Sequence, residues 1–304
     1  MNKFSIKDLE NLTGIKAHTL RVWEQRHGII IPKRTDTNIR YYDAEDLKKA
    51  LKVSLLNKYG YKISRIQKMG DLEIDNTINQ KADDDFKFEN TVNKLLIDAV
   101  NMDTVAFEDK IDDYINTNGL EQTIEHLLFA FLDKVGLMWM TNRILPAQEH
   151  LTSNIISRKI LLATEKLPSQ RHNSKTPSFL LFLPEGEIHE LALLYVHYLL
   201  RKHNLYPIYL GPDSPINDVA FVFKKLQPNY LYTHLTSVSK DFDVNKYLGK
   251  LTDACPSTNI FVSGSMLQKI NYSSGNKDVV FLNTLKEVKE QIIYIEKYGN
   301  YIKH

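Results

Sequence analysis

The sequence predicts a multi-domain chain that is all-α in its first part and α/β in its last part. Three observations predict this class. A basic segment over 1–70 shows short helical patterns and a hairpin, a segment over 87–170 shows only helical apolar spacing, and 177–304 alternates strand-like and helical runs. The 304 residues leave room for two or three domains of about 100–200 residues each.

The first segment begins with two short helices. Ser5 is a favourable N-cap for a helix over 5–11, and Thr13-Gly14 ends this helix. A second helix is expected over 17–26, where apolar residues again follow helical spacing. Two short helices separated by a glycine-containing turn are typical of a helix-turn-helix.

A hairpin and two further helices complete this segment. The runs 29–34 and 39–42 flank a polar turn, which predicts a two-stranded wing with a basic tip. Helices are expected over 44–57 and 61–69. We therefore predict a winged helix-turn-helix domain over 1–70.

Charge is unevenly distributed along the chain. Residues 1–70 hold fifteen lysines and arginines against seven acids, a net charge of +8, so the other residues must carry −6 of the overall +2. A basic module on a mildly acidic body favours a polyanion as the partner of the first part. A solvated basic face is the alternative that charge alone leaves open.

The middle of the chain is predicted to be helical after a linker. Residues 71–86 are polar and acidic with little apolar periodicity, which predicts a linker. Four helical stretches with short breaks then predict a four-helix bundle over 87–170. These stretches cover 88–101, 103–117, 120–141 and 147–167. A segment rich in Pro, Ser, His and Asn, 168–177, separates the bundle from the last part.

The last part alternates strands and helices. Strands are expected over 179–183, 206–210, 230–233, 260–262 and 279–282, and helices over 188–203, 215–226, 241–252 and 284–303. Such alternation requires crossover connections between parallel strands. We predict a Rossmann-like, doubly wound parallel sheet over 177–304.

The first 70 residues resemble the MerR-type winged helix-turn-helix in the order and spacing of Ser5–Leu9, Thr19–Glu24 and Arg40–Asp43. The resemblance implies that the second helix enters the major groove of double-stranded DNA. Arg21 is suited to a bidentate contact with guanine, while wing residues are suited to phosphates. Trp23 either packs beneath the helix or donates its ring nitrogen to a phosphate. The candidate DNA-binding residues are Lys16, His18, Thr19, Arg21, Trp23, Lys33, Arg34, Arg40 and Tyr41.

Two motifs in the rest of the chain carry possible ligand chemistry. Trp139 is followed ten residues later by Glu149-His150. A second motif, Glu187-Ile188-His189-Glu190, lies between the first strand of the α/β part and its helix. This loop is where an open parallel sheet places ligand groups.

Together these motifs resemble the cobalamin-binding module of light-responsive MerR-type regulators. The resemblance implies that His189 ligates cobalt from the lower face as a neutral imidazole, oriented by Glu187 or Glu190. Trp139, Glu149 and His150 would cover the upper face. Adenosylcobalamin, or another cobalamin, is the implied cofactor, and its nucleotide tail would be lined by Thr233, Ser263 and Gly264.

The sequence departs from the pattern of that family at four positions. Ala192 stands where the family has the last glycine of the histidine loop, and Thr233 and Ser263 replace a serine and a glycine along the tail. Met140 follows Trp139 where light-responsive members carry a histidine that takes the upper cobalt position. These changes leave open a pocket that binds another ligand or no cobalamin.

The leading interpretation is a DNA-binding transcriptional regulator, a repressor, controlled by adenosylcobalamin and by light. It would self-associate as a dimer or tetramer on an operator of inverted or direct repeats. One alternative is a MerR-type regulator with a degenerate pocket that senses another ligand or partner. Another is a corrinoid carrier subunit of a methyltransferase, against which stands the basic module, and we find no catalytic motif in the sequence.

Composition favours a cytoplasmic protein without a membrane partner. A single cysteine, Cys255, excludes an internal disulfide framework and favours a reducing compartment. No apolar run reaches the roughly 20 residues of a membrane helix, and the first residues lack a secretory apolar core.

Overall fold

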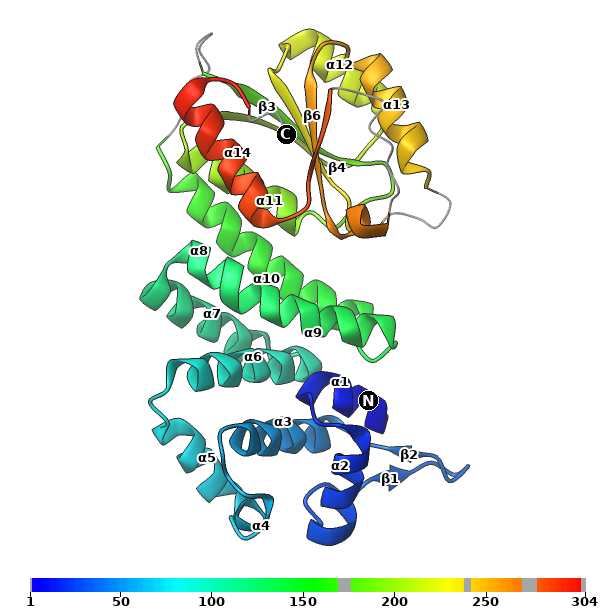
Figure 1. The fold of residues 1–304 in the computed structure, drawn as a ribbon, viewed down its shortest axis with the longest axis vertical. Helices are drawn as coiled ribbons and strands as arrows, with labels where there is room; N and C mark the ends of the chain where they lie inside the picture. The colour runs from blue at the N-terminus through cyan, green and yellow to red at the C-terminus, as the bar shows by residue number, and fades with distance from the viewer. Residues whose placement is uncertain (1, 169–175, 238–241, 270–277, 302–304) are drawn as a thin grey trace. The chain divides into compact units, whose positions relative to one another are not determined.

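The structure, a computed structural model, describes residues 2–168, 176–237, 242–269 and 278–301 (Figure 1). The chain divides into two compact units, Met1–Ile155 and Ile156–His304. Most of the predicted separator over 168–177 lies outside the described residues, as do the first residue of the predicted helix 241–252 and the end of 284–303.

The first unit begins with the predicted winged helix-turn-helix. Its elements are α1 (Ile6–Thr13), α2 (Ala17–Val22), a π-helical turn η1 (Trp23–His27), β1 (Lys33–Arg34), β2 (Arg40–Tyr41), α3 (Ala44–Lys58) and α4 (Ile63–Ile66). Ser5 and Asp8 form a capping box that starts α1, and Gly14 ends it in a left-handed conformation with a φ of 73°. The antiparallel strands β1 and β2 form the wing.

The predicted linker over 71–86 is wrong for most of its length. Residues Asp71–Gln80 form a helix, α5, whose only buried side chains are Ile74 and Ile78. This pair, one helical turn apart, buries a narrow apolar stripe, and α5 contacts α3. Three apolar residues among acids and amides, of which Leu72 is exposed, are too weak a periodic pattern to predict a helix from sequence.

The helical stretches predicted for the middle of the chain are confirmed. They are α6 (Asp84–Asn101), α7 (Thr104–Asn118), α8 (Leu120–Gln122) with η2 (Thr123–Leu128) and α9 (Phe129–Met140), and α10 (Pro146–Glu165). The third predicted stretch, 120–141, is therefore one continuous helix that contains the π-helical segment η2. Helix α6 contacts α7 and α9 as well as α3 of the preceding domain. The rings of Phe107 and Phe131, both fully buried, lie 5.2 Å apart at their centroids in this core.

The second unit contains the last part of α10 followed by the predicted α/β domain. Its elements are β3 (Ser178–Pro184), α11 (Leu191–Lys202), β4 (Tyr206–Ser214), α12 (Ile216–Leu226), β5 (Tyr230–His234), α13 (Val244–Ala254), β6 (Asn259–Ser263), η3 (Ser265–Lys269), β7 (Val279–Leu282) and α14 (Leu285–Tyr298). The short helix η3 was not predicted.

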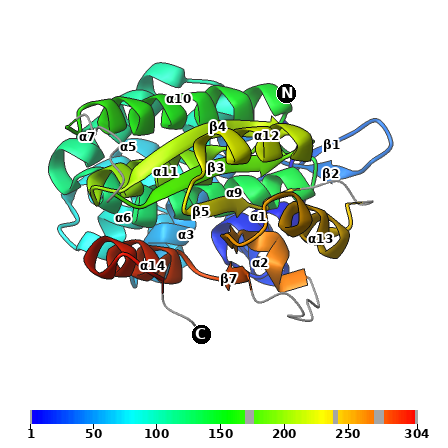
Figure 2. The same cartoon turned by 90° about the horizontal axis from the view of Figure 1, so that it is seen from above.

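All five strands of this unit are parallel, in the order β4-β3-β5-β6-β7. Helices α11 and α14 contact each other on one face of the sheet, and α12 and α13 contact each other on the other (Figures 1 and 2). Strand β3 is buried along its whole length, as expected for a strand covered on both faces. Its residue Phe182 pairs with Thr233 of β5, so the loops after these two strands start side by side.

Gly264 allows the ends of β5 and β6 to close on each other. Its φ is 118°, and a Cβ added there would lie 2.2 Å from the carbonyl oxygen of Leu235. The same carbonyl accepts a hydrogen bond from the backbone N–H of Met266. Only glycine fits this position, because both its conformation and the space beside it exclude a side chain.

We expect Gly264→Ala to lower the free energy of unfolding of the second unit by about 2–4 kcal/mol, through overlap and backbone strain. Urea denaturation followed by circular dichroism measures the change. Gly249→Ala is the matched control, because a Cβ there meets nothing within 4 Å. In the middle of α13 that change should stabilise by about 0.5–1 kcal/mol. Equal effects of the two substitutions would contradict the packing argument.

Candidate functional site

Helix α2 presents the residues predicted to read bases on its solvent side. Lys16, His18 and Arg21 are exposed and Thr19 is half-buried. Leu20, which is 1% exposed, anchors the opposite side of the helix in the core. The guanidinium of Arg21 is accessible from solvent, as a bidentate contact with guanine requires.

The indole of Trp23 lies in the core rather than on this surface. The residue begins η1 and is 5% exposed. Of the two roles that the sequence leaves open, the structure supports packing beneath the recognition helix.

Two of the four predicted wing residues already form ion pairs or hydrogen bonds through their side chains. The Nζ of Lys33 forms ion pairs with Asp43 and with Asp46, the latter at 3.3 Å, and hydrogen bonding to these carboxylates raises the pKa of Lys33. Arg34 donates to the carbonyl oxygen and Oδ1 of Asn38 at 3.3 and 2.7 Å. A phosphate contact by either residue therefore competes with these intramolecular bonds.

The other two wing residues lie on β2. Arg40 is exposed, and the ring of Tyr41 is half-buried beneath the Nζ of Lys3, 4.7 Å from the ring centroid. Both remain suited to a phosphate contact.

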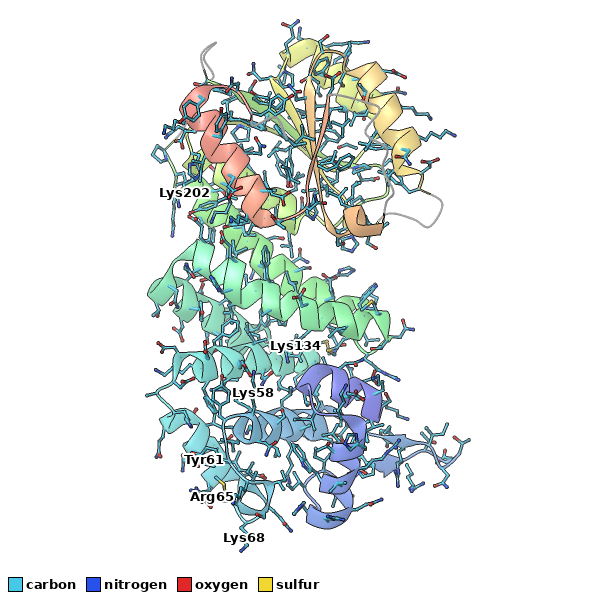
Figure 3. The ribbon with its side chains drawn as sticks, in the orientation of Figure 1. Lys58, Tyr61, Arg65, Lys68, Lys134 and Lys202 are labelled. Atoms are coloured by element: carbon cyan, nitrogen blue, oxygen red, sulfur yellow. The ribbon has the colours of Figure 1, made fainter. Side chains whose placement is uncertain are left out.

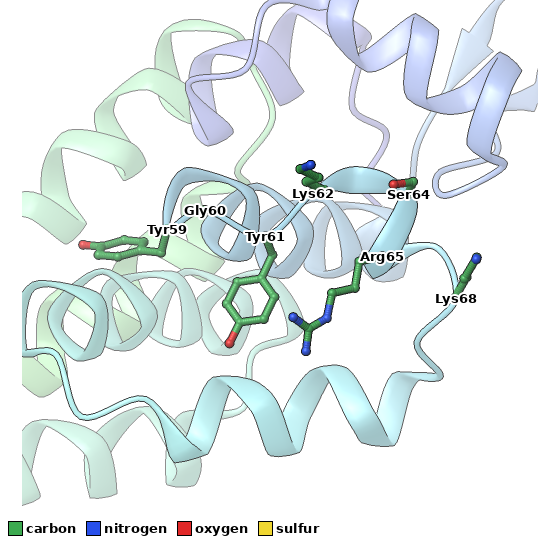
Figure 4. Close-up of a pocket in the computed structure, with 7 residues that line it drawn as sticks. All are labelled: Tyr59, Gly60, Tyr61, Lys62, Ser64, Arg65 and Lys68. Atoms are coloured by element: carbon green, nitrogen blue, oxygen red, sulfur yellow. The ribbon is translucent and has the colours of Figure 1, made fainter.

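A basic and aromatic surface beside α4 is absent from the sequence-based candidates. We call it the α4 basic surface, and it lines a pocket of about 510 Å³ formed by Tyr59, Gly60, Tyr61, Lys62, Ser64, Arg65 and Lys68. Arg65 and Tyr61 extend into the same space, with the guanidinium carbon 5.2 Å from the ring centroid (Figures 3 and 4). Three cations spaced three residues apart, Lys62, Arg65 and Lys68, were the available sign in the sequence, because residues at this spacing lie on one side of a helix.

In the same unit, the upper-face residues implied by the resemblance lie near the ends of α9 and α10. Trp139 is 47% exposed and Met140 is 73% exposed at the end of α9. In the first turn of α10, Nδ1 of His150 lies 2.8 Å from Oε2 of Glu149. An exposed indole and a carboxylate-anchored imidazole therefore border the turn between the two helices.

In the second unit, the loop after β3 holds a buried carboxylate against a histidine. Glu187 is fully buried, and its Oε1 accepts hydrogen bonds from Nδ1 of His189 at 2.6 Å and from the His189 backbone N–H at 3.0 Å. Its Oε2 accepts from the backbone N–H groups of Thr236 and Ser237 at 2.9 and 2.6 Å. The His189 side chain is 47% exposed, and Nε2 is its second ring nitrogen.

These contacts decide which acid accompanies His189 and in which charge state. Burial alone would raise the pKa of Glu187, but the hydrogen bonds from His189 and from the backbone lower this pKa to about 2. Glu187 is therefore ionised at neutral pH. Glu190, the other candidate, accepts instead from the hydroxyl of Tyr209 at 2.8 Å.

Polar side chains also gather where β5 and β6 end. Ser263 Oγ lies 2.5 Å from the hydroxyl of Tyr232 and 2.7 Å from Nδ1 of His234. Burial lowers the pKa of His234 to about 4, so this imidazole is neutral. The hydroxyl of Thr233 is buried and has no hydrogen-bond partner within the described part of the chain.

The described residues include neither a cluster of metal ligands nor a helix suited to span a membrane. No group of three or more His, Cys, Asp or Glu side chains there is arranged to hold a metal ion. No described helix is both long and apolar enough to cross a membrane.

Sequence comparisons assign the first two domains. Residues 4–72 match the MerR HTH family regulatory protein family, and residues 84–162 match the B12 binding domain family. The HTH-type transcriptional repressor CarH of Myxococcus xanthus is 24% identical over 259 residues, which cover 83% of this chain and 85% of CarH. The repressor CarA of the same organism is 23% identical over 263 residues, covering 85% of each chain.

A structural comparison supports the fold of about two thirds of the chain. The monomethylamine corrinoid protein of Methanosarcina barkeri matches with a TM-score of 0.50 and 15% identity. The match covers 68% of this chain and 99% of that protein. At this identity the likeness concerns the fold alone.

We expect Glu187→Gln to destabilise the second unit and to flatten its pH dependence. A carboxyl whose pKa falls from 4.5 to about 2 on folding contributes about 3 kcal/mol above pH 4.5, and this is lost as pH falls towards 2. Urea denaturation across this pH range measures the contribution. Glu296→Gln is the matched control, because Glu296 also binds a histidine Nδ1, that of His203 at 2.7 Å, but is 34% exposed. A similar pH profile for wild type and Glu187→Gln would refute the assignment.

Proposed function

Because the chain is a MerR-type DNA-binding regulator with a cobalamin-binding module, we propose that adenosylcobalamin sets its oligomeric state and its affinity for DNA. In this proposal the protein is a repressor, as both curated relatives are named. Light is a second input, and the protein has no catalytic role. One observation carries the proposal, namely the buried carboxylate of Glu187 on Nδ1 of His189.

The chemistry of the lower side fits a cobalt ligand. A ligating imidazole is commonly anchored through its second nitrogen by a carboxylate, which fixes the tautomer and the ring orientation. With Nδ1 of His189 donating to Glu187, the lone pair is on Nε2, in a side chain that is 47% exposed. The Thr233 hydroxyl, which has no partner among the described residues, offers a hydrogen bond to the nucleotide tail, beside Ser263 and Gly264.

The upper side would be covered by Trp139, Glu149 and His150. The exposed indole supplies an apolar surface for a large planar ring, while Glu149 holds the His150 imidazole through Nδ1. When bound, adenosylcobalamin would supply a light-sensitive bond between cobalt and carbon. Retention of the cofactor and response to light are separate questions, because Met140 stands where light-responsive relatives have a histidine.

Control of DNA binding would operate through the number of modules that are held together. A dimer or tetramer places several copies of α2 and of the α4 basic surface on one duplex, so that each binding event raises the effective concentration for the next. Such an assembly favours an operator with inverted or direct repeats.

One observation favours a second candidate, a regulator whose pocket takes no cobalamin. The Ser263 hydroxyl is already engaged by Tyr232 and His234, at the sheet edge where the tail would pass. A corrinoid carrier subunit of a methyltransferase is disfavoured, because a carrier has no use for a basic DNA-binding module.

We expect the protein mixed with adenosylcobalamin in the dark and desalted to keep the corrinoid, visible in its absorption spectrum. His189→Ala should lose the spectrum of histidine-ligated cobalt. His203→Ala is the matched control, because His203 also binds a glutamate through Nδ1 but lies outside this loop. A colourless wild-type protein would favour the second candidate, and the spectrum after illumination tests the effect of Met140.

We expect Arg65→Ala to weaken binding to all duplexes and to reduce the salt slope of log K by about 1, as the loss of one phosphate contact does. Arg21→Ala should instead cost about 1–3 kcal/mol on a selected operator and much less on mixed-sequence DNA. Fluorescence anisotropy at several salt concentrations measures both effects. Lys286→Ala, an exposed cation of the second unit, is the control and should change neither. An unchanged salt slope for Arg65→Ala would remove the α4 basic surface from the interface.

A further inference from the structure

The segment from Trp139 to His150 has an exposed part and a buried part, and we call it the 139–150 segment. Trp139 at one end and the His150 side chain at the other are 47% and 59% exposed. Between them Ile144 and Gln148 are 5% and 2% exposed, because the turn between α9 and α10 packs within the first unit. The turn is fixed by backbone bonds from Asn142 to Trp139 and from Arg143 to Met138.

The 139–150 segment contacts the helix-turn-helix through an ion pair. Nε of Arg143 lies 2.7 Å from Oδ2 of Asp8, a residue that is 5% exposed. The same oxygen accepts from the backbone N–H and the hydroxyl of Ser5 at 2.6 and 2.7 Å. Arg143 therefore binds the carboxylate that caps the start of α1, the first helix of the DNA-binding domain.

A second set of bonds joins the same turn to the N-terminal arm. Nδ2 of Asn2 donates to the carbonyl oxygen of Arg143 at 2.8 Å and to Oε1 of Gln148 at 3.2 Å. Gln148 in turn donates to the carbonyl oxygen of Val100 in α6 at 2.5 Å. Residues 2–8 are thus bound to residues 143–148 at several points, and these neighbour Glu149 and His150 directly.

Helix α9 also contacts the other end of α1. Lys134 lies on α9 (Figure 3), and its Nζ donates to the carbonyl oxygen of Leu12 at 2.7 Å and to Oδ1 of Asn93 at 3.2 Å. A cation at the C-terminal end of a helix is favoured by the helix dipole. Burial lowers the pKa of Lys134 to about 8. Lys134 and Arg143 therefore hold the two ends of α1, and Trp139 lies between them in sequence.

The contact between these domains holds a pocket beside its packed side chains. A pocket of about 330 Å³ lies among α1, α3, α6 and α9, bordered by Leu12, Leu51, Val92 and Lys134. An interface that keeps an open space beside its polar contacts can take up a second arrangement more readily than one that is close-packed throughout.

We propose that the Arg143–Asp8 ion pair couples the 139–150 segment to the DNA-binding domain, so that a ligand against Trp139 and His150 changes the position of α1 and hence of α2. Coupling between two sites is reciprocal, so DNA bound on α2 must also act on the 139–150 segment. The part of this inference that concerns the cofactor rests on the proposed function. The part that concerns DNA alone does not.

The chain offers a matched control for this ion pair. Lys58 of α3 pairs with Glu89 of α6 and so also joins the DNA-binding domain to the helical bundle. Its side chains are 61% and 32% exposed, and neither belongs to the 139–150 segment. Lys58→Gln therefore loosens the same two domains without touching the proposed link.

The first experiment measures hydrogen–deuterium exchange of the 139–150 segment with and without a mixed-sequence duplex at low salt, in full-length protein without cofactor. We expect DNA to change exchange in wild type and in Lys58→Gln but not in Arg143→Gln. Asp8→Asn, which breaks the pair from the other side, should behave like Arg143→Gln. Loss of the response in Lys58→Gln, or its persistence in Arg143→Gln and Asp8→Asn, would overturn the inference.

The second experiment measures the ratio of DNA dissociation constants with and without adenosylcobalamin. Coupling in proteins is typically about 5–150-fold, and we expect the wild-type ratio to fall towards 1 in Arg143→Gln while the affinity for cobalamin is retained. A wild-type protein that retains no cobalamin refutes the proposed function, and the exchange experiment then decides the inference. A wild-type protein that responds, with an equal response in Arg143→Gln, refutes the inference alone.

Discussion

A fully buried charge, the carboxylate of Glu187, constrains the second unit. Removing an ionised group from water is costly unless donors replace the lost hydration, and here four hydrogen bonds do so. The donors come from two loops, one after β3 and one after β5, so a single side chain fixes both at the carboxyl edge of the sheet. Glu187 in turn orients the His189 ring, so the geometry of the candidate ligand site depends on the hydrogen bonds that stabilise this buried carboxylate.

Most of the fold could be predicted from sequence because its signals are local. Strand β3 is an uninterrupted apolar run, and β3, β4, β5 and β7 each precede a helix-length segment, which identifies a parallel sheet without any knowledge of contacts. Helix α5 was missed because its stability comes from burying Ile74 and Ile78 against α3, and tertiary packing leaves little trace in such a short pattern.

The site residues likewise divide into those that a local sequence pattern predicts and those that only tertiary contacts identify. The motif containing His189 is visible in the sequence, but whether Glu187 or Glu190 accompanies it depends on Tyr209, which binds Glu190 from a neighbouring strand. The burial of Trp23 and the partners of Lys33 likewise depend on the folded chain. The contact between Arg143 and Asp8 spans 135 positions and carries no local pattern at all.

The N-terminal residues of the DNA-binding domain bind the turn between α9 and α10, and this limits how this domain can be exchanged between proteins. Asn2 lies before the first residue of the MerR match, 4–72, yet it binds Arg143 and Gln148. A chimaera that joins residues 4–72 to an unrelated sensor domain would keep the fold of the DNA-binding domain but lose the hydrogen bonds that Asn2 makes. A domain exchange at this junction keeps these hydrogen bonds only when Asn2 and the turn between α9 and α10 are transferred together. The two domains therefore behave as one structural unit, although they match different families.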